Sequence, residues 1–295
     1  MTRLSIIILS YNTKQYLEQV LRSLARVKKN DWEVIVVDNA SQDGSAQMVK
    51  EEFPFVKCIM NKKNVGFSAG NNSGIRRAQG AYVLLLNSDT EVHDAESIPT
   101  LLSYMDKHPD VGVVTPKVVL ADGTMDMASH RGIPTPWNSF SYFVGLERVF
   151  GKIPGAAHIF GGYHQTWKGV EYTHEVDACT AAAMLVRAAA IDEVGLLDEQ
   201  FFMYGEDLDW CYRFRKAGWK IVYNPEATII HHKNKSGVQV ETNDEIGKMT
   251  KKQATSQFFD TMELFYRKHY GKVYPRWFLG VVQFGVRCIR SMKGV

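Results

Sequence analysis

The chain has 295 residues, of which 45% are hydrophobic and 23% are charged, a balance typical of a globular protein with one large domain or two modest ones. This composition excludes a disordered chain, a collagen and a polytopic membrane protein. Lys and Arg number 35 against 32 Asp and Glu, so the net charge is +3, which is too small over this length to make nucleic acid the expected partner.

Redox and targeting signals favour a cytoplasmic protein. The cysteines lie far apart without a C-x-x-C pair, at Cys58, Cys179, Cys211 and Cys288, so reduced thiols are the simplest expectation. The first apolar run, residues 4–9, is too short for the core of a signal peptide. No stretch reaches the roughly 18 apolar residues that a spanning helix needs.

Strand and helix patterns alternate through the first 120 residues. Strands are predicted at 4–9, 33–37, 56–60, 82–86 and 111–115. Several of these are continuous apolar runs, as expected for a parallel sheet that is covered on both faces. Amphipathic segments between them predict helices, one over about 16–24, one starting near Asp43, one over 68–78 and one over 96–107. This order predicts a mostly parallel, doubly wound α/β sheet with helices on both faces and ligands at the carboxyl ends of its strands.

The pattern changes after about residue 122. Residues 137–172 contain nine aromatic residues among glycines without a clear period, which predicts a long functional loop or a lid. Regular patterns then resume, with a strand at 181–186, helices at 188–194 and 206–217, and strands at 220–223 and 227–231.

The C-terminal segment 276–295 predicts a basic amphipathic helix. One side carries Arg276, Gln283, Arg287 and Arg290, and the opposite side carries Trp277, Val281, Phe284 and Cys288. Such a helix suits the surface of an anionic membrane, and it equally suits packing on the protein's own core or on a second subunit. The oligomeric state stays open, with a dimer as one option.

Polar residues follow four of the predicted strands directly. They are Ser10-Tyr11-Asn12, Asp38 with its neighbours, the segment 64–72, and Asn87-Ser88-Asp89. Because the carboxyl ends of parallel strands share one edge of a sheet, these groups can build one pocket. Ordinary turn chemistry is the interpretation for Asp43. Asp38 and Asp89 differ because each comes directly after a buried apolar run.

Four further observations bear on the chemistry. Asp89 is a candidate ligand for Mg²⁺ or Mn²⁺, which take few protein carboxylates and complete their shells with phosphate oxygens and water. Glu206, Asp207 and Asp209 open a predicted helix, where the helix dipole offers a plain alternative explanation. His231, followed by another histidine, could be a second metal ligand or a core residue. The chain lacks both G-x-G-x-x-G after the first strand and a Walker A sequence, which argues against an NAD enzyme or a P-loop ATPase.

Six segments in this order together resemble the family 2 nucleotide-sugar glycosyltransferases, most closely the bacterial rhamnosyltransferase-like branch. They are SIIILSYN at 5–12, VVDNASQDGS at 36–45, NVGFSAGNNSGI at 64–75, LLLNSDTE at 84–91, FFMYGEDLDWCYRFRKAGWKI at 201–221 and HHKNKS at 231–236. The resemblance implies the GT-A fold. It also implies metal-assisted, inverting transfer of rhamnose or a similar sugar from a dTDP- or UDP-sugar to a glycan or polyprenyl-linked acceptor.

The resemblance also implies roles for individual residues. The donor would be bound by the base-contacting Asp38, by Ser10, Tyr11 and Asn12 around the base, and by Asn64, Gly66 and Asn71 beside the nucleotide and sugar. Asn87-Ser88-Asp89 stands where the family has Asp-x-Asp, so Asp89 would hold the metal with His231 and Asn87 would make a neutral contact. Asp207, paired with Glu206, would be the catalytic base.

On this basis, residues 1–122 would bind the nucleotide sugar, residues 123–236 would bind the acceptor and carry catalysis, and residues 237–295 would form a helical extension. The acceptor would be met at the inner face of the cytoplasmic membrane. Two other classes share part of the pattern. A sugar-1-phosphate nucleotidyltransferase would show a Gly-rich, basic phosphate loop after the first strand, and a non-catalytic nucleotide-sugar or glycan-binding module would not need Asp207 together with a metal pair.

Overall fold

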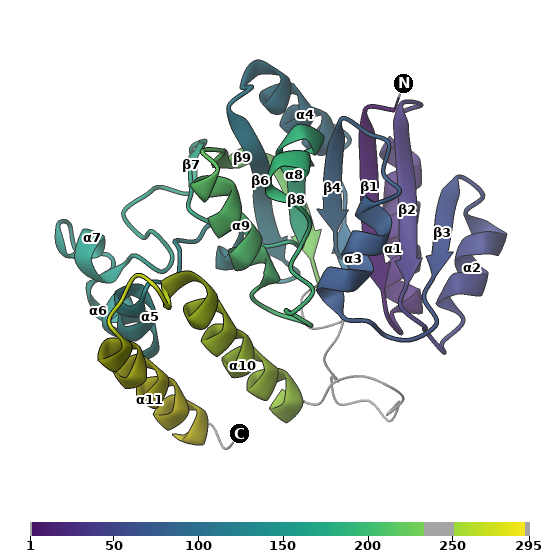
Figure 1. The fold of residues 1–295 in the computed structure, drawn as a ribbon. Helices are drawn as coiled ribbons and strands as arrows, with labels where there is room; N and C mark the ends of the chain where they lie inside the picture. The colour runs from purple at the N-terminus through teal and green to yellow at the C-terminus, as the bar shows by residue number, and fades with distance from the viewer. Residues whose placement is uncertain (1, 233–250, 293–295) are drawn as a thin grey trace.

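The computed structural model describes residues 2–232 and 251–292, and a single mixed sheet forms the centre of the fold (Figure 1). Within these ranges the sheet has nine strands in the order β3-β2-β1-β4-β8-β6-β9-β5, with β7 paired to β9. The strands are β1 (Leu4–Ser10), β2 (Trp32–Asp38), β3 (Val56–Met60), β4 (Tyr82–Leu86), β5 (Thr90–Glu91), β6 (Val111–Leu120), β7 (His174–Glu175), β8 (Ala183–Arg187) and β9 (Lys220–His231).

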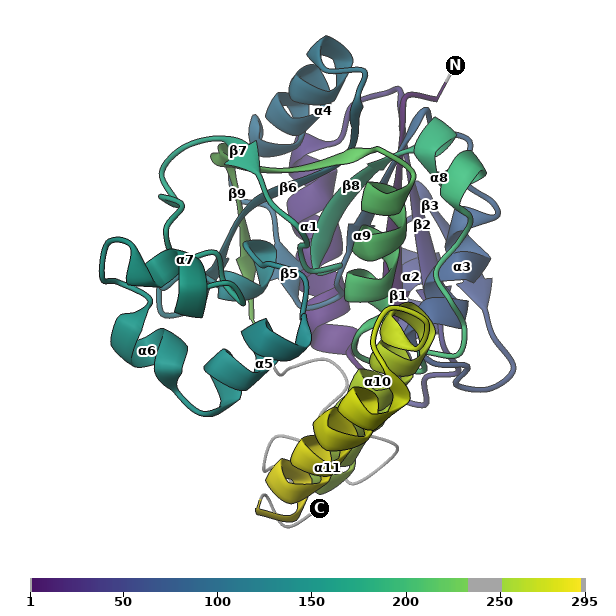
Figure 2. The ribbon, with the colours of Figure 1, turned by 60° about the vertical axis from the view of Figure 1, so that its left-hand side comes forward.

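Helices cover both faces of the sheet, as Figure 2 shows, so the predicted α/β class is confirmed. The helices of the sheet region are α1 (Lys14–Val27), α2 (Ser45–Glu52), α3 (Phe67–Ile75), α4 (Ser97–Lys107), α8 (Ala188–Val194) and α9 (Glu206–Lys216). Side chains of β1 alternate between the two faces: Ile6 and Ile8 pack with α1, α2 and α4, whereas Ile7 packs with α3 and α9. This alternation follows from the two-residue period of a strand.

The sheet contains two parallel blocks separated by an antiparallel strand. β3, β2, β1 and β4 run parallel, β6 and β9 run parallel, and β8 lies antiparallel between β4 and β6. The segment that connects β6 to β8 passes the amino end of β9, where His174 pairs with Tyr223, and then returns to the carboxyl end of β4, where Ala183 pairs with Leu86. The chain therefore re-enters the sheet from that end, and β8 must run in the opposite direction.

Residues 137–172 are not one irregular loop. They contain most of three short helices, α5 (Pro136–Phe143), α6 (Leu146–Phe150) and α7 (Ala156–Phe160), after the 3₁₀ turn η1 (Met127–Ser129). Helices of five to eight residues are too short to display a helical period in sequence. The start of α5 does carry a recognisable cap, because Thr135 accepts a hydrogen bond from the Asn138 N–H and Pro136 occupies the first turn.

The two strands predicted at 220–223 and 227–231 form one strand, β9. Its pairing with β6 shifts register between Pro116 and Lys117, which pair with Asn224 and Thr228. Pro225 lies in this bulge, where its missing N–H costs no ladder hydrogen bond. β9 thus runs the length of β6 and carries His231 to the carboxyl end of the sheet.

Two C-terminal helices, α10 (Lys251–Tyr270) and α11 (Arg276–Met292), pack side by side in both views. α11 realises the helix predicted from residue 276, and residues 293–295 lie outside the described part. Val286 is buried and Arg290 pairs with Asp260 on α10 at 2.6 Å. The side predicted to be apolar is exposed, with Trp277 at 71% and Phe284 at 69%. None of the described helices is long and apolar enough to cross a membrane.

Candidate active site

A cavity of about 290 Å³ lies at the carboxyl end of the sheet and brings together three side chains that are far apart in the chain. Asp89 follows β4, Asp207 lies in the first turn of α9, and His231 ends β9, and all three line this cavity. Asn87 and Glu206 line it as well. The sequence patterns predicted that Asp89, Asp207 and His231 lie close together, and the structure places them around one cavity.

His231 lies between two carboxylates. Its Nε2 is 3.3 Å from Asp89 Oδ1, and its Nδ1 is 3.3 Å from Asp126 Oδ2. Strand pairing fixes its position, because His231 pairs with Thr90 and the next residue, His232, donates its N–H to the Asp89 carbonyl at 2.8 Å. Burial would lower the pKa of His231, but hydrogen bonds to Asp126 and Asp89 outweigh it and raise the pKa to about 9.

The donor set around His231 fits a divalent cation that also binds a substrate. Asp89 offers a carboxylate and His231 an imidazole nitrogen toward the cavity, while Asp126 holds the other ring nitrogen, as the outer partner of a metal-bound histidine does. In residues 2–232 and 251–292, no three His, Cys, Asp or Glu side chains form a metal-binding group. With Asp89 and His231 as ligands, a diphosphate and water would complete the shell of such a cation.

Asp207 is held rigidly at the start of α9. Its Oδ2 accepts a hydrogen bond from Arg131 Nη2 at 2.6 Å, and its Oδ1 accepts one from the Leu208 N–H at 2.7 Å. The preceding turn places the helix start, with Tyr204 at φ +70° and Gly205 at φ +77°. A bulky residue in this left-handed region is strained, and such strain concentrates at functional sites.

Glu206, the neighbour of Asp207, is buried beside the same cavity. Its Oε2 has no hydrogen-bond partner among the described residues. Burial, and then the negative charge of Asp207, raise the pKa of Glu206 to about 8. At neutral pH Glu206 therefore keeps its proton.

The segment that precedes α9 is anchored on α3. Ser68 Oγ donates to the Phe201 carbonyl and the Phe67 N–H donates to the Phe202 carbonyl, both at 2.6 Å. Gly66 allows the close approach, because a Cβ on it would lie 2.6 Å from the Phe202 carbonyl oxygen. The segment 64–72 thus supports the turn that precedes α9.

Two asparagines of α3 have structural hydrogen bonds. Asn71 donates its amide to the Phe67 carbonyl at 3.0 Å. Asn72, which the sequence patterns did not single out, exchanges two hydrogen bonds with the backbone of Leu197, at 2.9 and 3.1 Å. These bonds fix the chain between α8 and α9.

The residues predicted to surround the base lie on the ends of β1 and β2 and do not line the described cavity. Ser10 and Thr13 hydroxyls are 2.9 Å apart, and Thr13 donates to Ser88 Oγ at 3.0 Å, next to Asp89. Tyr11 is half-buried beside them. Ser88 therefore links the end of β1 to the cavity.

The end of β2 is joined to this group by hydrogen bonds. Asn12 accepts from the Gln42 N–H at 2.8 Å, and Asp38 Oδ2 accepts from the Ser41 N–H at 3.0 Å. Asp38 is buried, and its Oδ1 accepts no hydrogen bond from a described residue. Asn64 bridges the amide of Asn39 and the N–H of Gly66.

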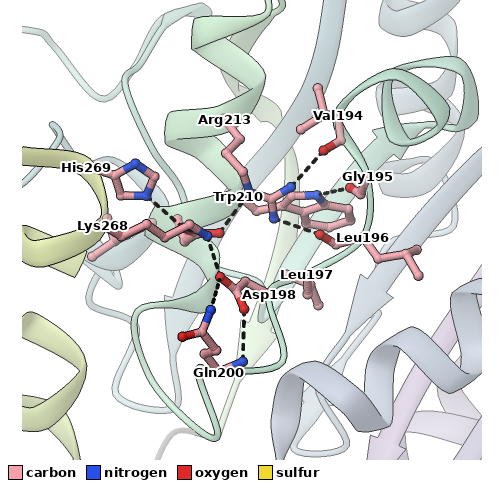
Figure 3. Close-up of polar contacts among 12 residues, drawn as sticks. Val194, Gly195, Leu196, Leu197, Asp198, Gln200, Trp210, Arg213, Lys268 and His269 are labelled. Carbon is pink, nitrogen blue, oxygen red and sulfur yellow. Dashed lines mark hydrogen bonds and ion pairs between the residues drawn. The ribbon is translucent and has the colours of Figure 1, made fainter. Parts of the chain in front are cut away.

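A network of charged residues holds α10 against α9. Asp209 is fully buried, and its carboxylate contacts Lys268 Nζ at 2.6 Å, His269 Nε2 at 2.7 Å and Arg213 Nε at 2.9 Å. Figure 3 shows how Lys268 and His269 reach across from α10 toward the side of α9 that carries Arg213.

The same network holds the chain that follows α8. Arg213 donates to the carbonyls of Val194 and Leu196 at 2.9 and 2.7 Å, and Trp210 donates to that of Gly195 at 2.9 Å. Asp209 is thus a structural residue rather than part of the cavity, and its network fixes the helix that covers the cavity.

Sequence patterns missed two kinds of cavity residue. Asp126 and Arg131 lie in an irregular segment that follows no predicted strand directly, so no pattern marked them. The residues of α10 that line the cavity, by contrast, have helical spacing, which predicts that they lie on one face of a helix. They are Phe258, Thr261, Met262, Phe265 and Tyr266. In the predicted motif HHKNKS, residues 233–236 lie outside the described residues.

The fold and the comparison with known families identify the chain as a glycosyltransferase. The model of glycosyl transferase family 2 matches residues 5–168, and the chain belongs to this family. The predicted enzyme class is confirmed, and both alternative classes are disfavoured by this match.

Curated relatives have the same kind of activity. The chain is 29% identical over 242 residues to the N-acetylglucosaminyl-diphospho-decaprenol L-rhamnosyltransferase of Mycobacterium tuberculosis, a match that covers 78% of this chain and 76% of that protein. It is 27% identical over 233 residues to a low-salt glycan biosynthesis hexosyltransferase of Haloferax volcanii, covering 78% and 67%.

Solved structures of glycosyltransferases share the GT-A fold with this chain. A Pyrobaculum calidifontis mannosyltransferase in complex with GDP-mannose and Mn²⁺ aligns with a TM-score of 0.58 at 13% identity, covering 96% of this chain and 69% of that one. Residues 1–349 of TarS from S. aureus with UDP-GlcNAc align with a TM-score of 0.58 at 17% identity, covering 96% and 70%. The predicted GT-A class is confirmed.

Proposed function

We propose that the chain is an inverting, metal-assisted glycosyltransferase that moves rhamnose or a similar sugar from a dTDP- or UDP-sugar to a lipid-linked glycan acceptor. The observation that carries this proposal is the meeting of Asp89, His231 and Asp207 around one cavity. A carboxylate–imidazole pair and a separate, fixed carboxylate are what this reaction needs on the two sides of the transferred sugar.

Inverting transfer is one displacement at the anomeric carbon through an oxocarbenium-like state. The acceptor oxygen bonds to that carbon while the bond from the carbon to the diphosphate breaks. Asp207 takes the hydroxyl proton as the new bond forms, a contribution of roughly 10²–10⁴-fold. Glu206, which keeps its proton at neutral pH, can donate a hydrogen bond in the same cavity.

The opposite side of the cavity suits the diphosphate. Asp89 and His231 would hold Mg²⁺ or Mn²⁺, which when bound neutralises charge on the leaving diphosphate. Asp126 orients the His231 ring, because its carboxylate accepts a hydrogen bond from the Nδ1–H and leaves Nε2 directed toward Asp89. The Pyrobaculum calidifontis structure, solved with GDP-mannose and Mn²⁺, supports this assignment by analogy.

The donor base would bind at the ends of β1 and β2. The buried Asp38 Oδ1, which has no hydrogen-bond partner among the described residues, is suited to accept a hydrogen bond from a pyrimidine N–H. Ser10, Tyr11 and Asn12 lie on the neighbouring strand end. The named activity of the Mycobacterium tuberculosis relative supports rhamnose as the sugar and a polyprenyl diphosphate-linked acceptor.

The acceptor would be met at a membrane surface. Exposed apolar side chains occur on the short helices α5–α7, including Trp137, Phe140 and Ile159, and on α11, including Trp277 and Phe284. A flotation assay with vesicles containing anionic lipid tests this. Trp277→Ser combined with Phe284→Ser should reduce flotation, whereas Met60→Ser, which removes an exposed apolar side chain of the edge strand β3, should not.

A binding panel followed by a transfer assay tests the function itself. Thermal shifts are measured with dTDP-L-rhamnose, UDP-GlcNAc and GDP-mannose, each with Mn²⁺, Mg²⁺ or EDTA, and nucleoside diphosphate release is then measured with polyprenyl diphosphate-linked N-acetylglucosamine. Asp207→Asn should bind donor but lose transfer, and Asp89→Ala should also lose metal-dependent binding. Asp43→Asn, a control carboxylate whose partners are Lys14 and Ser45, should behave as wild type. Full transfer by Asp207→Asn would refute the base assignment.

A further inference from the structure

A buried ion pair joins Arg131 to the proposed base. Arg131 Nη2 lies 2.6 Å from Asp207 Oδ2, and the two side chains are only 12% and 11% exposed. The Arg131 backbone is fixed by two hydrogen bonds with Ala178, at 3.0 and 2.8 Å. The cation is thus presented by a segment that is anchored independently of α9.

Two adjacent carboxyl groups, those of Glu206 and Asp207, differ in their contact with Arg131. Glu206 and Asp207 line the same cavity, and two neighbouring buried carboxyl groups do not both ionise readily. Arg131 binds an oxygen of Asp207, while Glu206 Oε2 has no partner in the described residues. The geometry therefore favours negative charge on Asp207.

Among the described residues, the charge of Asp207 acts on four titratable groups, Arg131, Glu206, Tyr163 and Cys179. Of these four groups, Arg131 is the cation. Burial raises the pKa of Tyr163 and that of Cys179, so both stay neutral at pH 7. Burial would lower the pKa of Arg131, but the charge of Asp207 raises it further above its ordinary value, so Arg131 stays charged.

We propose that Arg131 is a positioning residue that decides which of two adjacent carboxyl groups acts as the base. It holds Asp207 ionised and oriented and leaves Glu206 uncharged. The proposal rests on the proposed function, because it requires Asp207 to take the acceptor proton. When the proton moves to Asp207 and the diphosphate leaves, the Leu208 N–H and Arg131 still hold the carboxyl group in place.

Kinetics of three variants test the role. Arg131→Met keeps the length without the charge, Arg131→Lys keeps the charge, and Arg215→Met removes an Arg–Asp pair of 3.0 Å that does not line the cavity. The probes are dTDP-L-rhamnose, MnCl₂ and polyprenyl diphosphate-linked N-acetylglucosamine. For Arg131→Met we expect kcat to fall about 100-fold at pH 7, with the donor KM within about threefold and the acidic limb of the pH profile moved about one unit higher.

The lysine variant should recover most of the lost kcat, and Arg215→Met should match the wild type. A merely structural role would lower the folded fraction and leave the pH profile unmoved. Wild-type kcat with an unmoved profile in Arg131→Met, alongside an inactive Asp207→Asn, would overturn the inference on Arg131 and leave the base assignment standing. Full activity of Asp207→Asn would instead overturn the base assignment.

Carboxyl ¹³C NMR on Asp- and Glu-labelled protein tests the inference without donor or acceptor, with signals assigned through Asp207→Asn and Glu206→Gln. At pH 6.5 the wild type should show Asp207 ionised and Glu206 protonated, and Arg131→Met should show Asp207 partly protonated. Arg131→Gln, which is also uncharged, serves this measurement if the methionine variant does not fold. Identical charge states in variant and wild type would overturn the proposal.

Discussion

Replacing Asp209 by Asn should destabilise the protein in a way that depends on pH. Burial alone would raise the pKa of Asp209, but hydrogen bonds from His269 and Lys268 and the charge of Arg213 lower it from 3.8 to about 2. At about 1.36 kcal/mol for each tenfold change in proton affinity, this is about 2 kcal/mol of stability at pH 7. Breaking a buried ion pair by removing one partner costs about 3–5 kcal/mol, which sets the upper end of the expected loss of stability.

The sign follows from the direction of the pKa change. A carboxyl group whose pKa is lower in the folded state stabilises it fully above the unfolded pKa, and that stability is lost as the pH falls through about 2. The difference in unfolding free energy between wild type and Asp209→Asn should therefore be complete at pH 5–7 and about half as large at pH 3.

Urea unfolding followed by tryptophan fluorescence measures this difference. Asp192→Asn, which changes an exposed carboxylate on α8, is the control and should stay within about 0.5 kcal/mol of wild type. An equal gap at pH 7 and pH 3, or no gap at pH 7, would refute the reasoning that the charge of Asp209 holds α10 in place.

Three other changes have defined outcomes. Gly66→Ala should lower both stability, by more than about 1 kcal/mol, and transfer rate, because Gly66 has φ +87° and faces the Phe202 carbonyl; unfolding and transfer assays check this. Asn72→Ala should cost about 1–3 kcal/mol and speed hydrogen exchange at Leu197, whose N–H it leaves without its acceptor. In the wild type, stability should fall between pH 5 and 8, because the Glu206 carboxyl keeps its proton to about pH 8 in the folded state and releases it near 4.5 in the unfolded state. Glu206→Gln should remove this fall. Thermal unfolding across the range measures it, and the same dependence of stability on pH in variant and wild type would contradict the prediction.

Elements with strong local patterns could be predicted from sequence. The strands at 56–60 and 82–86 and the helix at 188–194 have the predicted bounds, because compact apolar runs or a helix-forming run end at turn residues. The direction of β8 could not be predicted, since an apolar run reports burial and not orientation. Its direction depends on the end of the sheet at which the chain re-enters.

The residues of the candidate site also divide into those that could be predicted from sequence and those that could not. Asp89, His231 and Asp207 could be found because each stands at the end of a strand or at the start of a helix. Asp126 and Arg131 could not, because backbone and side-chain contacts distant in sequence place them, such as the bridge from Arg131 to Ala178. The spacing of the aromatic residues on α10 is typical of a helix. The position of α10 over the cavity, however, depends on the buried charges that hold it against α9.

The part of the chain that matches the family ends at residue 168, whereas the wall formed by α10 begins at Lys251. The residues proposed to bind the donor and the aromatic residues of α10 that line the cavity lie in separate stretches of sequence. Exchanging residues 251–270 for the equivalent helix of a relative, with Lys268 and His269 retained as fasteners, offers a route to chimeric enzymes with altered acceptor choice and unchanged donor choice.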